Sequence, residues 1–203
     1  MMWNDCYKIS NIEKYPLPWD KRDIDTAMDS WITHEFDTQW EQQDWKLSLS
    51  RAGHIPGAGM LNINTPSKNI LFTGDFDSRD SPLTSGAKPI KTDVLFIEGT
   101  YGGKDHANQN EELTRFIDNI IRVTDKGGTV LIPAFANGRT QDMLMRLHQN
   151  CPELDVHVDG MGKRITKLYL ENTQFIKDPK ALNSAWNWCR RVASKSDRKK
   201  ALD

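Results

Sequence analysis

The feature that most constrains the fold is a change of pattern near residue 100. Between residues 45 and 99 the sequence either alternates apolar and polar side chains or runs apolar, as β-strands do. Four stretches fit: "WKLSLSRA", "GMLNIN", "NILFTG" and "DVLFIEG". Short turns such as "NTPSKN" favour antiparallel neighbours. We therefore predict a sheet-rich layer up to about Gly99.

After this layer, strands alternate with helices. "EELTRFIDNIIRV" has one apolar face at helical spacing, and "KGG" supplies the glycine that ends such a helix. "TVLIPAF" and "LDVHVDG" are predicted as strands, and "GRTQDMLMRLHQN" and "KRITKLYL" as helices. This alternation predicts parallel βαβ units, so residues 107–170 are expected to form a doubly wound α/β module.

The two ends of the chain carry weaker signals. Residues 1–34 are predicted to be irregular, with Asp20 or Asp23 as the cap of a short helix through "IDTAMDSWI". The tail "ALNSAWNWCRRVASKSDRKKALD" is predicted as a helix that becomes basic. Its cations could contact an RNA backbone, but a solvated helix end is the commoner explanation of such a run.

Charge and composition limit the kind of protein. The 203 residues carry a formal net charge of −1, so no whole-chain field draws the protein to nucleic acid or membrane, and any polyanion site must be a local basic patch. Three irregularly spaced cysteines indicate reduced thiols in the cytoplasm rather than disulfides. No apolar run approaches the roughly 18 residues of a membrane span, and no signal-peptide segment is evident. We expect a cytoplasmic α/β protein.

Two possible metal ligands follow predicted strands. His54 precedes the small-residue turn "IPGAG", where an imidazole can face a cleft and bind zinc, or can be half-buried and bonded to backbone. Asp75 follows "LFTG", where a carboxylate can bridge two metal ions or cap a turn. The two residues together, each after a strand and a turn, are better evidence than either alone.

Three further residues are candidates for the same chemistry. Glu98 closes an apolar strand and could orient a metal-bound histidine, or could accept N–H groups of "GTYGG". Arg139 begins the helix after "IPAFANG", where a guanidinium and free helix N–H groups can receive a phosphate. Gln141 belongs to the same turn and is a candidate for binding RNA or phosphate. A routine strand-to-helix turn is the alternative.

Four of these stretches share a family resemblance. "AGHIPGAGM", "LFTGDF", "DVLFIEGTYGG" and "TVLIPAFANGRTQDML" resemble consecutive segments of β-CASP nucleases with the metallo-β-lactamase fold, above all RNA-processing members of the cleavage and polyadenylation specificity factor type. The resemblance covers residues 46–170. It implies a partial metallo-β-lactamase αβ/βα sandwich over residues 1–105, followed by part of a doubly wound β-CASP domain over residues 106–203.

The resemblance also implies an activity, which is zinc-dependent hydrolysis of RNA phosphodiester bonds. In the complete family site, two zinc ions are bound. His54 resembles a ligand of one zinc, and Asp75 resembles the carboxylate that bridges both and takes part in catalysis. Glu98 resembles the catalytic acidic residue of motif A, where glutamate favours the RNA branch over the DNA-repair branch. RNA would lie between the two domains.

The chain departs from the family in lacking the ligand motif HxHxDH upstream of His54 and the site histidines expected downstream. We therefore expect the middle of a nuclease, inactive alone and weak in zinc binding, which a homodimer or a complementing polypeptide could complete. The alternative is a non-catalytic RNA-binding or scaffold subunit of an RNA-processing complex. A small-molecule hydrolase of the lactamase type is less favoured, because such enzymes need no "FANGRTQDML" segment.

Overall fold

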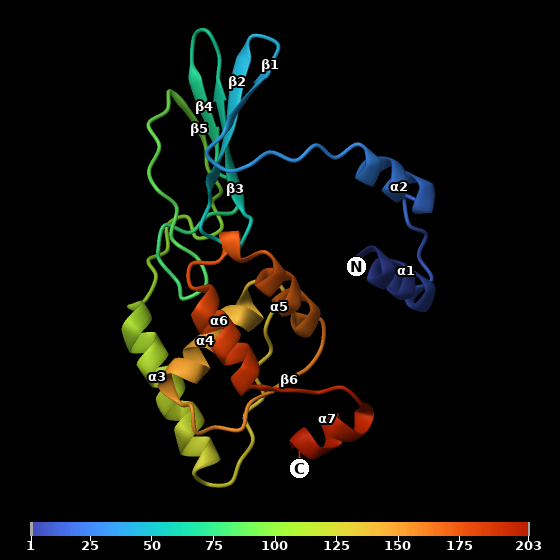
Figure 1. The fold of residues 1–203 in the computed structure, drawn as a ribbon, viewed down its shortest axis with the longest axis vertical. Helices are drawn as coiled ribbons and strands as arrows, with labels where there is room; N and C mark the ends of the chain where they lie inside the picture. The colour runs from blue at the N-terminus through green and yellow to red at the C-terminus, as the bar shows by residue number, and fades with distance from the viewer. Residues whose placement is uncertain (1, 203) are drawn as a thin grey trace. The chain divides into compact units, whose positions relative to one another are not determined.

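The computed structural model describes residues 2–202, and the chain divides into two compact units, Met1–Glu35 and Phe36–Asp203 (Figure 1). The first unit contains two helices, α1 (Met2–Glu13) and α2 (Lys21–Asp29). The short helix predicted within residues 1–34 is present as α2, whereas the irregular chain predicted before it is wrong, because α1 forms there.

The start of α2 is fixed by a reciprocal cap. The Asp20 carboxylate accepts hydrogen bonds from the amides of Arg22 at 2.6 Å and Asp23 at 3.2 Å. The Asp23 carboxylate in turn accepts from the Asp20 amide at 2.7 Å. Such capping typically contributes about 1 kcal/mol to helix stability. The predicted cap is confirmed, although the helix ends at Asp29 rather than continuing through Ile32.

The second unit begins with a five-stranded sheet in the order β1-β2-β3-β4-β5. The strands are β1 (Gln39–Gln42), β2 (Trp45–Arg51), β3 (Gly59–Asn64), β4 (Asn69–Phe72) and β5 (Val94–Phe96). The first four pair antiparallel, and β5 pairs parallel to β4. The strands predicted from the sequence are confirmed, as is the antiparallel start of the layer.

The sheet is held by an apolar cluster at the end where β2 stops. Met60 of β3 and Leu71 of β4 are buried there with Ala52 and Ala87. Ala87 belongs to the long connection between β4 and β5, and its amide donates to the Asp77 carbonyl oxygen at 2.8 Å. This connection therefore packs against the same end of the sheet that carries the candidate residues.

Helices make up most of the remaining chain. They are α3 (Gln109–Thr124), α4 (Arg139–Asn150), α5 (Gly162–Glu171), the 3-10 turn η1 (Thr173–Phe175), α6 (Pro179–Trp188) and α7 (Lys195–Leu202). Leu144, Leu182 and Trp186 lie in the core that α4, α5 and α6 share. Ile117 and Ile120 form the buried face of α3 that the sequence predicts.

One predicted strand is missing. Residues 129–135, "TVLIPAF", form no strand, and the side chains of Leu131 and Phe135 are 82% and 81% exposed. A strand needs a neighbouring backbone to pair with, and within residues 2–202 no strand pairs with this segment. The prediction of a buried strand at residues 129–135 is therefore wrong for the described residues.

The parallel sheet expected within residues 107–170 is limited, over the described residues, to one short pair. β6 (His157–Val158) pairs parallel with β7 (Arg190–Arg191). β7 also interrupts the tail, so the single helix predicted there is two helices, α6 and α7. An α/β fold is confirmed, whereas the domain boundary expected at residue 105 stays a prediction.

Two bulk expectations can be compared with the structure. All three cysteines are free of disulfides, as expected. Within residues 2–202, no helix combines the length and the apolar character that crossing a membrane requires.

Candidate functional site at one end of the sheet

His54 lies in the loop that joins β2 to β3. The loop is closed by the Ala52 amide, which donates to the Ala58 carbonyl oxygen at 2.9 Å. Because Arg51 and Gly59 are paired across β2 and β3, the loop stands at one end of the sheet. The imidazole is half-buried at this position.

Asp75 and Glu98 follow the neighbouring parallel strands β4 and β5. The Thr73 amide donates to the Phe96 carbonyl oxygen at 3.0 Å, and the Glu98 amide donates to the Thr73 hydroxyl at 3.3 Å. Parallel strands end at the same side of a sheet, so both acids reach the end where His54 lies. Asp75 is exposed and Glu98 is half-buried.

The Glu98 carboxylate is held by its own turn. Its Oε2 accepts a hydrogen bond from the Thr100 amide at 2.7 Å. The hydrogen bonds from Thr100 are the main cause that lowers the pKa of Glu98, and the charge of His54 lowers it further. Glu98 is therefore ionised at neutral pH, and it is close enough to His54 for their charges to interact.

The donor atoms at this end suit zinc in kind but not in number. Imidazole nitrogen and carboxylate oxygen both bind zinc, yet a catalytic site takes three protein ligands and a water. Among residues 2–202, no group of three or more histidine, cysteine, aspartate or glutamate side chains could hold a metal ion. The metal roles expected for His54 and Asp75 stay predictions.

A cavity of about 70 Å³ opens beside His54. This volume exceeds the roughly 10–15 Å³ that one water needs. The lining includes three arginines and three aspartates, which are Arg79, Arg139, Arg146, Asp77, Asp80 and Asp142. The cavity is therefore a charged hollow built from segments far apart in the sequence.

Most charges of this cavity are already paired. Arg79 binds Asp77 with two hydrogen bonds, at 3.0 Å and 2.8 Å, and Arg146 binds Asp142 at 2.8 Å. Lys177 binds Asp80 at 2.9 Å from outside the lining. Of the three arginines that line the cavity, Arg139 is the one that these ion pairs do not include.

Arg139 is the cation of the cavity that has no carboxylate within 4.0 Å among the described residues. It begins α4, is exposed and lines the same cavity as His54. The pKa of Asp77 is lowered mainly by its hydrogen bond from Arg79, and the charge of Arg139 lowers it further. The phosphate-binding role expected for Arg139 suits this position and stays a prediction.

Gln141 faces the interior instead. Its side chain is 0% exposed, and its amide nitrogen lies 3.1 Å from the Ala136 carbonyl oxygen, 3.2 Å from that of Gly162 and 2.9 Å from the Thr166 hydroxyl. Its side-chain oxygen is buried without a hydrogen-bond partner. The structure therefore places Gln141 in the interior between α4 and α5, and the RNA- or phosphate-binding role expected for it stays a prediction.

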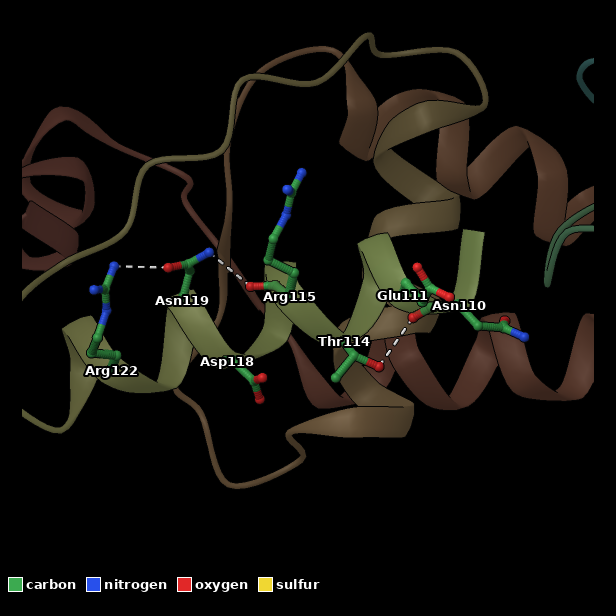
Figure 2. Close-up of a pocket in the computed structure, with 7 residues that line it drawn as sticks. All are labelled: Asn110, Glu111, Thr114, Arg115, Asp118, Asn119 and Arg122. Atoms are coloured by element: carbon green, nitrogen blue, oxygen red, sulfur yellow. Dashed lines mark hydrogen bonds between the residues drawn. The ribbon is translucent and has the colours of Figure 1, made fainter. Parts of the chain in front are cut away.

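The sequence reasoning missed Asp77 and Arg79, which lie two and four residues beyond Asp75 in "GDFDSRD". An Asp-x-Arg pair directly after a candidate ligand is a signal that could have included them. The surface has a second, larger hollow along α3, but all of its lining residues lie on that one helix (Figure 2). None of the candidate residues contributes to it.

Comparison with known proteins gives a consistent set of relatives. No family model matches the sequence. The chain is 31% identical over 208 residues to "Probable RNase MJ4" of Methanocaldococcus jannaschii, covering 100% of this chain and 49% of that protein. It is 30% identical over 203 residues to "RNase aCSPSF2" of Saccharolobus solfataricus, covering 98% of this chain and 41% of the relative.

A eukaryotic relative is similar over a shorter region. "Cleavage and polyadenylation specificity factor subunit 3" of Dictyostelium discoideum is 35% identical over 152 residues, which cover 73% of this chain and 20% of that protein. The chain thus spans half or less of the length of each of these curated relatives.

Proposed function

Because this chain belongs to the cleavage and polyadenylation specificity factor-like family of RNA nucleases, we propose that it supplies part of the active centre that hydrolyses RNA phosphodiester bonds in RNA processing. The observation that carries the proposal is the meeting of His54, Asp75 and Glu98 at one end of the sheet. An imidazole and two carboxylates come together there, and His54 also lines the cavity to which Arg139 belongs.

In this proposal His54 and Asp75 are two ligands of a zinc centre, with Asp75 between two ions. Glu98 acts beside them, where its carboxylate would orient the His54 imidazole. Bound zinc would supply a water with a pKa near 7. The remaining ligands would come from outside residues 2–202, from a second copy of the chain or a complementing polypeptide. The chain alone is then expected to bind zinc weakly and to cleave RNA poorly.

Arg139 would bind an RNA phosphate at the mouth of the cavity. A guanidinium suits this role because it presents paired donors to phosphate oxygens. Gln141 would contribute indirectly, by holding α4 against α5 so that Arg139 keeps its place. The buried position of Gln141 supports this positioning role over direct contact with RNA.

The finer architecture follows from the family resemblance. We assign residues 1–105 to part of a metallo-β-lactamase sandwich and residues 106–203 to part of a β-CASP domain, with RNA as the partner. The exposed apolar segment 129–135 is consistent with a sheet that further strands would complete. The free cysteines support a cytoplasmic setting.

The test is a chimera in which this chain replaces the aligned region of "RNase aCSPSF2" of Saccharolobus solfataricus. We expect the chimera to cleave single-stranded RNA and to bind zinc. Asp75→Asn should lower kcat by about 100-fold or more, because a bridging carboxylate holds the metals that stabilise phosphoryl charge. The measurements are RNA cleavage rates and zinc content by mass spectrometry.

Asp118→Asn is the matched control, because Asp118 is an exposed aspartate on α3 outside the site. It should leave the rate unchanged. A folded chimera that binds zinc but does not cleave RNA, or one whose rate is indifferent to Asp75→Asn, would refute the proposal.

A second candidate is a non-catalytic RNA-binding or scaffold subunit. It is favoured by one observation, that no group of three metal-binding side chains occurs within residues 2–202. RNA binding by the purified chain that depends on salt but not on added zinc, together with an inactive chimera, would favour this second function.

A further inference from the structure

The charge of the chain is divided very unevenly along its length. Residues 155–203 contain 11 lysines and arginines against six aspartates and glutamates, a net charge of +5. Residues 1–154 have a net charge of −6, which the whole-chain value of −1 conceals. Such a basic segment is either a solvated surface or a binding site for a negatively charged partner, and the positions of its cations decide which.

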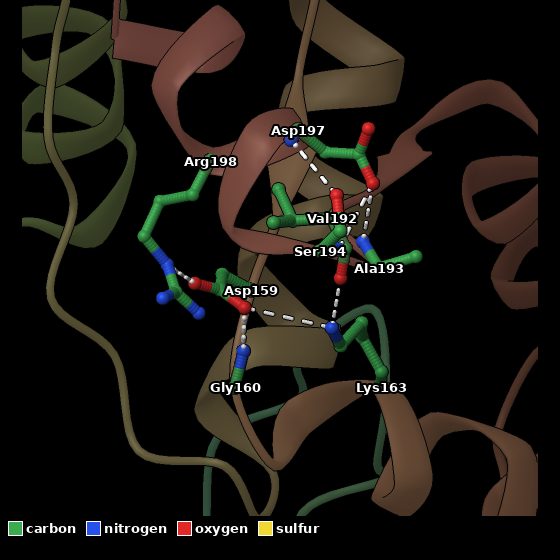
Figure 3. Close-up of polar contacts among 8 residues, drawn as sticks. All are labelled: Asp159, Gly160, Lys163, Val192, Ala193, Ser194, Asp197 and Arg198. Atoms are coloured by element: carbon green, nitrogen blue, oxygen red, sulfur yellow. Dashed lines mark hydrogen bonds and ion pairs between the residues drawn. The ribbon is translucent and has the colours of Figure 1, made fainter.

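The fold brings two cations from separate helices onto Asp159 (Figure 3). Arg198 of α7 binds the Asp159 carboxylate at 2.5 Å, and Lys163 of α5 lies 3.5 Å from its other oxygen. The Lys163 ammonium also donates to the Val192 carbonyl oxygen. These contacts fix α7 beside the start of α5, so the basic tail is packed against the fold.

Two further lysines flank Arg198 on α7. Lys195 and Lys199 are four residues apart, and Lys195 and Arg198 are three apart, so the three lie on one side of the helix. Both lysines are exposed, and no carboxylate lies within 4.0 Å of either among the described residues. We call Lys195, Arg198 and Lys199 the basic face.

The acidic groups nearby do not neutralise this face. Asp155 binds Arg190 at 3.0 Å and His157 at 3.3 Å, and Asp159 is shared by two cations. Asp197 is occupied in accepting the Ala193 and Ser194 amides, at 3.2 Å and 2.9 Å. The basic face is thus opposed by the carboxylates of Asp159 and Asp197, while Lys195 and Lys199 have no carboxylate partner among the described residues.

We propose that the basic face is a docking surface for the backbone of single-stranded RNA, separate from the cavity beside His54. The inference rests on the proposed function in taking RNA as the polyanion. Exposed lysines beside an arginine on one side of a helix suit contact with RNA phosphates, which requires no base recognition. The face would hold substrate RNA whatever its sequence.

The test is binding of a fluorescein-labelled, unstructured 20-nucleotide RNA to the full chain, measured by fluorescence anisotropy across a series of KCl concentrations. Each lost phosphate contact lowers the salt slope by about 0.7 for single strands. Lys195→Gln with Lys199→Gln should therefore lower the slope by about 1.4 and weaken binding about tenfold near 0.15 M salt. Arg198 is kept, so that α7 stays docked on Asp159.

Arg115→Gln with Arg122→Gln is the matched control. It removes the same charge from exposed positions of another helix, α3, where Arg115 binds Glu112 and Arg122 binds Asn119 (Figure 2). The control should leave the salt slope unchanged. Equal effects of the two double variants, or no effect of either, would overturn the proposal. So would equal competition by polyglutamate of matched charge, which would indicate an acidic protein partner instead.

The outcome can be separated from that of the proposed hydrolysis. If the chimera is active and needs Asp75, but RNA binding does not depend on Lys195 and Lys199, the basic face is refuted and the proposed function is supported. If RNA binding depends on the basic face but the chimera is inactive, the RNA-docking role of the basic face is supported and the proposed hydrolysis is refuted. Absence of RNA binding by the chain would overturn the basic face directly.

Discussion

At the scale of single residues, Arg139 and Gln141 show how two neighbours in one helical turn take different roles. Arg139 is exposed beside the cavity, whereas Gln141 is 0% exposed and bonded to three backbone or hydroxyl oxygens. Both were candidates for binding RNA on the sequence alone. Substitutions at the two positions should therefore affect different measurable quantities.

Gln141→Met should lower the free energy of unfolding by about 1–3 kcal/mol, because it leaves buried acceptors of Ala136, Gly162 and Thr166 short of a donor. Arg139→Met should leave stability within about 0.5 kcal/mol and weaken RNA binding instead. Urea unfolding and RNA anisotropy on both variants check this. Comparable loss of stability in the two variants would contradict the separation of roles.

Local signals predicted His54, Asp75 and Glu98 because each follows a strand at a recognisable turn. The same signals did not predict the cavity, since Asp77, Arg79 and Asp142 gain their role from packing between distant segments. Burial was also hidden, because nothing in "GRTQDML" distinguishes an inward glutamine from an outward one without knowledge of the neighbouring helix.

At the scale of elements, α7 depends on the ion pair of Asp159 with Arg198. Hydrogen bonds from Arg198, followed by the Gly160 amide, lower the pKa of Asp159 to about 2. A carboxyl whose folded pKa is lowered stabilises the fold above its unfolded pKa, near 3.9, and loses that contribution as pH falls through the folded pKa. The docking of α7 should therefore weaken between about pH 4 and pH 2.

Hydrogen exchange of the α7 amides across this pH range is the measurement, with rates corrected for the intrinsic pH dependence of exchange. Protection should fall in the wild type as the pH drops. In Asp159→Asn protection should be low already at pH 5 and change little below it. Wild-type protection that persists unchanged to pH 2 would show that Asp159 does not hold α7.

The elements themselves were predicted where local pattern and tertiary packing agree. β2, β3 and β4 have short connections and mutual partners, so alternation sufficed to place them. Residues 129–135 have the apolar pattern of a strand but no partner among the described residues, and pairing rather than pattern decides whether a strand forms. The tail was predicted as one helix, because nothing local indicates that the Arg190 amide donates to the Val156 carbonyl oxygen at 2.8 Å.

At the scale of the whole molecule, charge and chemistry lie in different parts of the sequence. The candidate ligands and most acidic residues belong to residues 1–154, and the basic face belongs to residues 155–203. An RNA held by its phosphates on the basic face would not compete with the carboxylates at the end of the sheet for the cations beside His54. The near-neutral net charge of the chain therefore conceals two regions of opposite net charge.

The pairing of β5 with β4 has a consequence for how the molecule opens. Four residues join β3 to β4, but 21 residues join β4 to β5, and β5 pairs over only three positions. Closing the longer loop costs about 1.5 kcal/mol more in chain entropy. β5 should thus be the first strand to detach in native fluctuations, so the Thr73 amide should exchange faster than the β2 amides bonded to β3. Each detachment of β5 would separate Glu98 from Asp75. The candidate site would therefore be complete only while β5 is paired with β4.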